Sequence, residues 1–298
     1  MNRIIPKHIQ IETINGVCSS RCIMCTFDSW TRKKNVMSLD TFKLILTKFV
    51  PYKDKIELMT IHGCGEPLLD REIAQKIKCA KDMGFRGTGF ATNCTELGEK
   101  MSVDLLESGV DTVICSIDGI NKQTHESIRV RTDFDKVTLN VKNFIQLRNK
   151  YNYNTRIMIR FIRMDLNHNQ WPEFHGYWTA QLDKTRRDDV VKFDIHNWGN
   201  KMENYTSHDI NKDMGLSNYI CQDVFERMFI YSNGEVALCC GDDNGFFNHG
   251  NVIESDPIDI YNNEIFTYYR QMMKDGKILD LKHCENCTIP RSRALKEK

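Results

Sequence analysis

Apolar and polar residues follow two periods along the first two thirds of the chain. Short stretches that alternate with period two indicate strands, and longer stretches with apolar residues three or four positions apart indicate helices. After Ser38, apolar side chains recur at Phe42, Ile45, Leu46 and Phe49, which is typical of an amphipathic helix with a serine N-cap. The other predicted helices cover residues 70–82, 98–108 and 134–150 and begin again near 169; the predicted strands cover 9–13, 56–61, 86–91, 111–117, 155–162 and 190–195.

This alternation gives six strand–helix units in succession. Strict alternation predicts an α/β protein with a parallel sheet, here curved into a partial (β/α)6 TIM-like barrel. In such barrels the active residues lie on the loops that follow the carboxyl ends of the strands. We therefore expect the functional residues on those loops.

The pattern changes after about residue 205. Two apolar strands flank Asn233-Gly234, a strong hairpin signal that predicts a type I′ turn. A helix is predicted over about 262–275, with Gly276 suited to the position after its end. We expect a barrel over residues 1–205, followed by a small hairpin-plus-helix domain over 206–298.

Composition narrows the class of protein. The chain carries 41 basic and 40 acidic side chains, a balance that favours neither nucleic acid nor an anionic membrane as a partner. We find no signal peptide and no apolar stretch of membrane-spanning length, so we expect a cytoplasmic protein. In that compartment its 12 cysteines are expected to be metal ligands and buried thiols rather than disulfides.

Three cysteines, Cys18, Cys22 and Cys25, lie in one polar loop directly after the first predicted strand. Three thiolates cannot complete the four-coordination of one zinc ion, but they can hold three corners of a [4Fe–4S] cluster. The fourth iron would then be open to a ligand. Three unrelated thiols are the alternative, which the polar loop disfavours.

The C-x3-C-x2-C spacing of this loop resembles the signature of radical S-adenosylmethionine (SAM) enzymes. The resemblance implies that SAM chelates the open iron through its amine and carboxylate. Its reductive cleavage would give a 5′-deoxyadenosyl radical that removes a hydrogen atom from substrate. It also implies an external electron donor such as flavodoxin or ferredoxin.

The loop HGCGEP resembles the glycine-rich GGEP loop of the same family. Gly63 and Gly65 would permit close backbone approach, and Glu66 would bind the SAM amine. Cys64 departs from the usual glycine. Taken alone, Glu66 is more typical of a solvated turn.

Two later segments also resemble SAM-binding motifs. Asn93 belongs to a strand end similar to the family's TNG motif, with Cys94 in place of the glycine. In the SIDG region the resemblance implies that Ser116 binds the SAM ribose and that Arg129 binds its carboxylate, which an arginine fork suits. Without the cysteine loop, the SIDG segment would be an ordinary strand-to-helix turn.

Three polar residues on the last two barrel strands are candidate catalytic residues. Arg160 interrupts an apolar strand and would face the barrel interior, where it could hold SAM, hold a substrate anion or form a structural ion pair. Asp194 and His196 end the sixth strand and are candidate substrate contacts or a general base. His196 could equally be an ordinary loop residue.

Four C-terminal cysteines could meet at a second metal centre: Cys221, Cys239, Cys284 and Cys287, with Cys240 as a possible replacement for Cys239. Four thiolates fit either a structural zinc or a fully ligated [4Fe–4S] cluster. Their arrangement around the hairpin and helix resembles the auxiliary-cluster region of SPASM/Twitch radical SAM proteins, and within these the 2-deoxy-scyllo-inosamine dehydrogenase-like Twitch enzymes. Because no cysteine follows Cys287, the resemblance implies one auxiliary cluster.

The resemblance favours an oxidoreductase that dehydrogenates a small polar metabolite, such as a sugar or cyclitol alcohol. The auxiliary cluster would take the second electron. Only about seven residues precede the first strand, which leaves no room for an N-terminal peptide-recognition module. The alternatives are radical SAM modification of a ribosomal peptide, by thioether formation or epimerisation, and a zinc-binding module without enzymatic activity.

Overall fold

The computed structural model describes residues 3–198, 201, 220–247, 249–285 and 287–289. In this part of the chain the main sheet has eight strands in the order β10-β9-β7-β6-β5-β1-β11-β12. Neighbouring strands pair in parallel, except that β12 runs antiparallel to β11. The strands are β1 (His8–Ile11), β5 (Leu58–Thr60), β6 (Thr88–Thr92), β7 (Thr112–Ser116), β9 (Arg156–Arg163), β10 (Asp189–Asp194), β11 (Arg227–Ile230) and β12 (Val236–Ala237).

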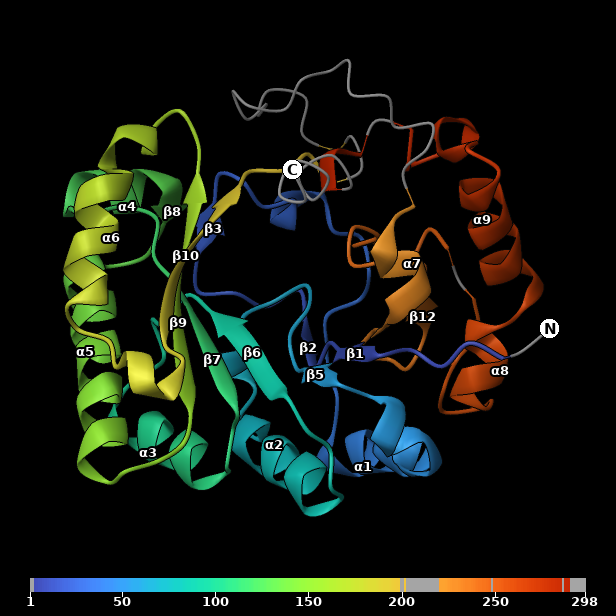
Figure 1. Ribbon diagram of the computed structural model, residues 1–298, viewed down its shortest axis with the longest axis horizontal. Coiled ribbons are helices and arrows are strands. Elements are labelled where there is room, and N and C mark those ends of the chain that lie inside the picture. Colours follow the sequence, from blue (N-terminus) through green and yellow to red (C-terminus); the bar gives the residue numbers. More distant parts are fainter. Residues whose placement is uncertain (1–2, 199–200, 202–219, 248, 286, 290–298) are drawn as a thin grey trace.

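Helices cover the outer face of this curved sheet (Figure 1). They are α1 (Leu39–Phe49), α2 (Ile73–Asp82), α3 (Glu99–Glu107), α4 (Lys122–Ile128), α5 (Phe134–Lys150) and α6 (Trp171–Thr179). The predicted α/β partial barrel is therefore confirmed. The short helix α4 was not among the predicted elements.

Helix α1 shows how the sequence pattern produces the packing. The Ser38 hydroxyl caps the helix by accepting a hydrogen bond from the Thr41 N–H at 3.1 Å. The predicted apolar stripe of Phe42, Ile45, Leu46 and Phe49 is fully buried beneath the sheet. Burial of four large side chains on one face is what fixes the helix against the strands.

Two short strand pairs hold the cysteine loop near the carboxyl ends of the main strands. Strand β2 (Ile14–Asn15) pairs with β4 (Asn35–Val36), and β3 (Arg21–Cys22) pairs with β8 (Arg129–Val130). The second pair places Cys22 directly opposite Arg129. Cys22 and Arg129, more than 100 positions apart in the sequence, thereby lie side by side.

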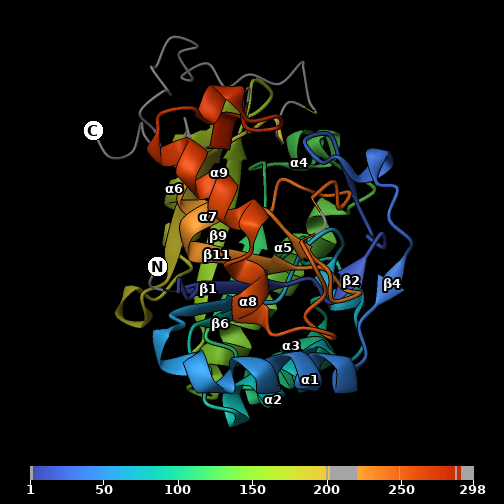
Figure 2. The ribbon, with the colours of Figure 1, turned by 90° about the vertical axis from the view of Figure 1, so that its right-hand side faces the viewer.

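The C-terminal hairpin extends the barrel sheet. Strand β11 pairs in parallel with β1, so the N-terminal strand lies between the barrel and the hairpin. Helices α7 (Gln222–Glu226), α8 (Pro257–Tyr261) and α9 (Glu264–Lys274) lie together on this side of the molecule (Figure 2). The predicted domain boundary at residues 205 and 206 lies outside the described residues.

The predicted type I′ turn is wrong. Such a turn needs positive φ at both central residues, but Gly234 has φ 86° and Asn233 is not in that region. The loop is three residues long, since the Tyr231 N–H donates to the Glu235 carbonyl and the Gly234 N–H donates to the Tyr231 carbonyl. The buried Glu12 carboxylate accepts from the Ser232 N–H at 3.0 Å and so binds the loop in this longer form.

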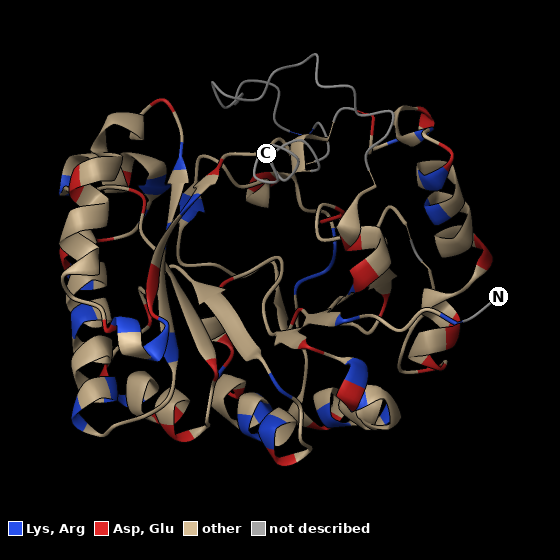
Figure 3. Cartoon of the chain, in the orientation of Figure 1, with Lys and Arg blue, Asp and Glu red and all other residues tan. Residues whose placement is uncertain are grey.

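Charged side chains of both signs are mixed over the outer helices (Figure 3). This distribution agrees with the near-zero formal net charge of +1. Within the described ranges, no helix combines the length and the apolar composition needed to cross a membrane.

Candidate metal and cofactor sites

The structure brings the three cysteines of the N-terminal loop together. The Ser20 hydroxyl lies 3.4 Å from Cys18 Sγ and 3.3 Å from Cys22 Sγ, so two thiols flank one hydroxyl. The Cys25 N–H donates to the Cys22 carbonyl at 3.0 Å, which folds the third cysteine back toward the second. All three thiols are half-buried and free of disulfides.

The electrostatics of this loop suit a bound cation. Burial raises the pKa of Cys18, and burial together with the neighbouring Cys22 raises the pKa of Cys25 to about 12. Metal ligation requires thiolates, so a cation must stabilise the negative charge here. In the ranges that the structure covers, no three His, Cys, Asp or Glu side chains lie close enough together to bind one metal ion in common. Thiolates that each bind a different iron are the donor set of a [4Fe–4S] cluster.

Glu66 connects the glycine-rich loop after β5 to the end of β6. Its buried carboxylate accepts from the Leu68 N–H at 3.2 Å, the Thr92 hydroxyl at 2.6 Å and the Asn93 N–H at 2.9 Å. Asn93 Nδ2 in turn donates to Ser19 Oγ at 3.0 Å, within the cysteine loop. Glu66 and Asn93 thus both lie beside the predicted cluster, and Thr92, the first residue of the TNG-like strand end, holds the Glu66 carboxylate in place.

The two glycines of this loop occupy positions that a larger residue could not. A Cβ atom on Gly65 would lie 2.8 Å from the Ile14 carbonyl oxygen and 3.0 Å from that of Val17. A Cβ atom on Gly63 would lie 2.5 Å from Glu12 Cβ. The close backbone approach expected from the motif is therefore present between this loop and the segment leading into the cysteines.

Arg129 lies near Cys22, and Arg129 and Ser116 each already have a protein partner. Arg129 Nη2 pairs with Asp118 Oδ2 at 2.7 Å, and Arg129 Nη1 lies 3.7 Å from Cys22 Sγ. Ser116 Oγ accepts a hydrogen bond from Arg160 Nη2 at 2.7 Å. Asp118, which the sequence alone places in a strand-to-helix turn, is thus the residue that positions Arg129.

The three candidate catalytic residues take different places. Arg160 contacts Ser116 on the inner face of β9. Asp194, at the end of β10, accepts from Arg163 Nε at 2.7 Å. The His196 ring lies 4.3 Å from the Trp198 ring, between centroids, and the Trp198 indole N–H donates to the Met24 carbonyl in the cysteine loop. Asp194 and His196 therefore lie at the end of β10, beside the cysteine loop.

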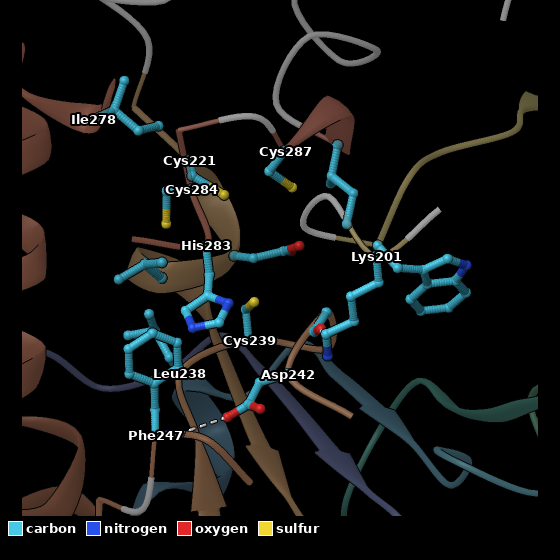
Figure 4. Close-up of a pocket in the computed structure, with 15 residues that line it drawn as sticks. Lys201, Cys221, Leu238, Cys239, Asp242, Phe247, Ile278, His283, Cys284 and Cys287 are labelled. Atoms are coloured by element: carbon cyan, nitrogen blue, oxygen red, sulfur yellow. Dashed lines mark hydrogen bonds between the residues drawn. The ribbon is translucent and has the colours of Figure 1, made fainter. Parts of the chain in front are cut away.

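The four predicted C-terminal cysteines line a second site, a cavity on the C-terminal side of the molecule. Figure 4 shows Cys221, Cys239, Cys284 and Cys287 around this space. Burial raises the pKa of the Cys239 thiol well above its ordinary value and that of Cys284 to about 12. As at the first site, thiolates here require a bound cation.

The structure also distinguishes the two adjacent cysteines. Cys239 lines the cavity. Cys240 packs against Phe229 on the inner face of the sheet, where its Sγ accepts from Arg227 Nη1 at 3.2 Å. Cys239 is therefore the fourth thiol of the C-terminal site.

Four polar residues on the wall of this cavity were not found from sequence: Lys201, Asp223, Asp242 and His283. Figure 4 labels Lys201, Asp242 and His283. Asp242 accepts hydrogen bonds from the N–H groups of Phe246 and Phe247 at 2.9 and 3.0 Å, which folds the segment after the cysteine pair. Only positional signals for these residues were present in the sequence: Asp242 lies three residues after Cys239, and His283 directly precedes Cys284.

Two family models match the two segments of the chain that contain these cysteine sites. Residues 13–161, which are 149 of the 298 residues, match the model of the radical SAM superfamily, and residues 221–288 match the SPASM model, described as an iron–sulfur cluster-binding domain. Among curated relatives, the tungsten-containing aldehyde ferredoxin oxidoreductase cofactor-modifying protein of Pyrococcus furiosus is 31% identical over 112 residues. The match spans 38% of this chain and only 31% of that protein.

Solved structures share the fold over nearly the whole chain. BtrN in complex with AdoMet and 2-DOIA has a TM-score of 0.64 at 20% identity, and the alignment covers 95% of this chain and 93% of BtrN. SuiB of Streptococcus suis bound to S-adenosylmethionine has a TM-score of 0.69 at 15% identity, covering 95% of this chain and 72% of SuiB. At these identities the likeness is one of fold.

Proposed function

The chain belongs to the radical SAM superfamily, and from that premise we propose that it is an oxidoreductase that dehydrogenates a small polar metabolite, such as a sugar or cyclitol alcohol. The observation that carries this proposal is the pairing of two thiol sites in one fold. A three-cysteine loop leaves one iron of a cluster open, and a separate four-cysteine cavity can ligate a second cluster completely. The oxidation of an alcohol removes two electrons. Hydrogen-atom abstraction takes one of them, so a second redox group is needed to accept the other.

The donor sets fit the two groups that the family implies. Cys18, Cys22 and Cys25 would hold one [4Fe–4S] cluster, and a second would bind at the cysteines that line the C-terminal cavity: Cys221, Cys239, Cys284 and Cys287. When bound, the first cluster with SAM supplies a 5′-deoxyadenosyl radical for hydrogen abstraction, and the second accepts the remaining electron.

The surrounding residues would position SAM. Glu66 and Asn93 lie beside the cysteine loop, where a carboxylate and an amide can receive the SAM amine. We assign the SAM ribose to Ser116 and its carboxylate to Arg129, which Asp118 holds in place. Gly63 and Gly65 keep the loop backbone close enough for these contacts.

Substrate chemistry falls to the side chains at the ends of β9 and β10. Asp194 is oriented by Arg163, and as a carboxylate it can accept the hydroxyl proton of the alcohol. His196 would border the substrate, and Arg160 would bind it from the inner face of β9. Flavodoxin or ferredoxin would supply the electron for SAM cleavage. A reducing cytosol suits the 12 free thiols.

Likeness to SuiB, which was crystallised bound to its precursor peptide SuiA, favours a second candidate. In that case the chain would modify a ribosomal peptide by thioether formation or epimerisation. Family membership disagrees with the hypothesis of a zinc-binding module without enzymatic activity.

The experiment is anaerobic reconstitution with iron, sulfide, SAM and a strong reductant. Release of 5′-deoxyadenosine together with a metabolite two mass units lighter supports dehydrogenation. Carrying out the reaction in deuterated solvent separates dehydrogenation from epimerisation, because epimerisation leaves the mass of the substrate unchanged except for solvent deuterium. Thioether formation also removes two hydrogens, and it is distinguished by a substrate that is a peptide rather than a small metabolite. Failure to release 5′-deoxyadenosine under strong reductant would overturn the proposal.

A further inference from the structure

His283 lies on the wall of the C-terminal cavity, next to the cysteines that would hold the auxiliary cluster. It directly precedes Cys284 in the sequence, and both residues line the cavity. Figure 4 shows its ring extending into this space beside Cys239. The proposed dehydrogenation assigns no role to this side chain.

One ring nitrogen of His283 is buried and lacks a hydrogen bond. Among the described residues, the Nε2 atom has no partner within hydrogen-bond distance. Buried polar atoms in folded proteins are nearly always paired, because an unpaired one keeps the full cost of its desolvation. An unpaired nitrogen on the wall of a site for a bound group indicates a contact that forms when the group binds.

The two carboxylates on the cavity wall do not accept this hydrogen bond. The Asp242 carboxylate accepts from the N–H groups of Phe246 and Phe247 at 2.9 and 3.0 Å. Asp223 pairs with Arg227 at 3.3 Å. When the site is loaded, the acceptors added to it are sulfur atoms, from the thiolates and from the cluster itself. Sulfur is therefore the acceptor that a loaded site offers to His283.

Two phenylalanines and the backbone hold the imidazole ring in place. The His283 ring centroid lies 4.2 Å from that of Phe246 and 5.2 Å from that of Phe247, with the second pair at an interplanar angle of 80°. His283 also has φ 71°, in the left-handed region that is uncommon for residues other than glycine. A strained backbone of this kind persists only where the surrounding structure holds it. The ring is thus positioned on the cavity wall by the protein itself.

We propose that His283 donates a hydrogen bond from Nε2 to a sulfur atom of the auxiliary cluster or of its cysteine ligands, and so raises the reduction potential of that cluster. The inference rests on the proposed function, in which this cluster accepts one electron from the substrate. A cluster becomes more negative when it is reduced, so an N–H donor stabilises the reduced form more than the oxidised form. His283 thereby makes the cluster a stronger oxidant for the second electron of the alcohol.

The test is an anaerobic redox titration followed by EPR. In every sample Cys18, Cys22 and Cys25 are replaced by Ala, so that only the auxiliary cluster contributes to the signal. Into this reference protein we introduce His283→Phe, which keeps an aromatic ring without the N–H, or His283→Gln, which keeps an N–H donor at a similar reach. Iron analysis confirms that each sample holds about four iron atoms.

His249→Phe is the matched control. Both ring nitrogens of His249 are also buried without a hydrogen bond among the described residues, and its ring stacks on Phe247 with the centroids 5.9 Å apart. Unlike His283, however, His249 is not among the residues that line the cavity. The same substitution at this position therefore tests for a general change in packing.

We expect His283→Phe to shift the one-electron reduction equilibrium at least tenfold toward the oxidised form, which is about 59 mV. His283→Gln and His249→Phe should stay within about threefold of the reference protein. An unchanged potential in His283→Phe would overturn the inference. So would an equal fall in His283→Gln, which would assign the effect to the ring rather than to the N–H, or an equal fall in His249→Phe.

A second measurement does not depend on a variant that loads its cluster. Pulsed EPR of the reduced reference protein, prepared with isotopically labelled histidine, should detect magnetic coupling between the cluster and an imidazole nitrogen. Absence of this coupling overturns the inference even where His283→Phe takes up no iron. Both measurements are made without substrate. An unchanged potential therefore rejects only the role of His283, whereas a failure to oxidise any alcohol rejects only the proposed function.

Discussion

Glu12 and Arg32 form a buried two-point ion pair between the barrel and the C-terminal region. Arg32 Nη1 and Nη2 donate to the two Glu12 carboxylate oxygens at 2.9 and 2.6 Å, and the Glu12 side chain is 0% exposed. The same carboxylate accepts from the N–H groups of Cys64 and Ser232 at 3.0 Å each, and Arg32 Nε donates to the Asp243 carbonyl at 2.8 Å. One pair thus connects the glycine-rich loop to the segment that follows Cys239 and Cys240.

Removing Arg32 is expected to destabilise the protein strongly. In Arg32→Met the Glu12 charge stays buried without its counterion, and breaking one partner of such a pair costs about 3–5 kcal/mol. Urea unfolding under anaerobic conditions measures the free energy of unfolding. Lys33→Met, an exposed neighbour on the same loop, should change it by less than about 0.5 kcal/mol. A similar, small loss in both variants would contradict the structural role of the pair.

A methyl group at Gly65 is expected to displace the glycine-rich loop. The added Cβ would meet the backbone oxygens of Ile14 and Val17 at 2.8 and 3.0 Å, and backbone atoms cannot move aside as a flexible side chain can. We expect Gly65→Ala to lower stability by about 1–3 kcal/mol and to weaken SAM binding at least tenfold. Gly176→Ala is the contrast, because nothing lies within 4 Å of its Cβ position in helix α6. That variant should be neutral or stabilising by up to about 1 kcal/mol.

The adjacent cysteines of the C-terminal region should differ in their effect on iron content. Cys239 lines the cavity, whereas Cys240 contacts Arg227 on the inner face of the sheet. Iron analysis after reconstitution should therefore fall from about eight to about four atoms per chain in Cys239→Ala, and stay near eight in Cys240→Ala. The triple replacement of Cys18, Cys22 and Cys25 by Ala should also remove about half of the iron, together with all SAM cleavage. If Cys240→Ala loses iron and Cys239→Ala does not, the ligand is Cys240.

Acidification should destabilise the fold through His125. This residue is fully buried, its Nδ1 accepts the Asp118 N–H at 3.4 Å, and burial lowers its pKa to about 3. Below the unfolded-state pKa of about 6.5 the unfolded chain binds a proton that the folded chain does not. The contribution of His125 to the free energy of unfolding is thus fully present above that pH. It is lost as the pH falls, by about 2 kcal/mol between pH 6.5 and 5.

Urea unfolding at pH 7 and pH 5 measures this loss. His125→Asn keeps an acceptor near the Asp118 N–H but cannot take up the proton, so the difference between the two pH values should shrink by about 2 kcal/mol. His175→Asn, on the exposed face of α6, serves as the control and should leave the difference unchanged. An unchanged difference in His125→Asn would mean that other groups cause the acid sensitivity.

The sequence by itself was sufficient for most of the elements, and it identified both cysteine sets as candidate ligands. Local periodicity identified α1 and its Ser38 cap, and α5 begins and ends where the pattern predicts. The spacing of Cys18, Cys22 and Cys25 is a local property as well, because all three cysteines lie in a single loop. Short helices such as α4 were missed, since seven residues carry too little periodicity.

Only the tertiary structure decided how distant segments meet. The parallel pairing of β11 with β1 and the position of Cys239, rather than Cys240, on the wall of the C-terminal cavity depend on sheet order. The Glu12–Arg32 pair likewise cannot be predicted from sequence. A glutamate is expected to be exposed to solvent unless a buried partner for its charge is known. Contacts between residues remote in sequence follow from the packing of the whole chain, which local patterns do not contain.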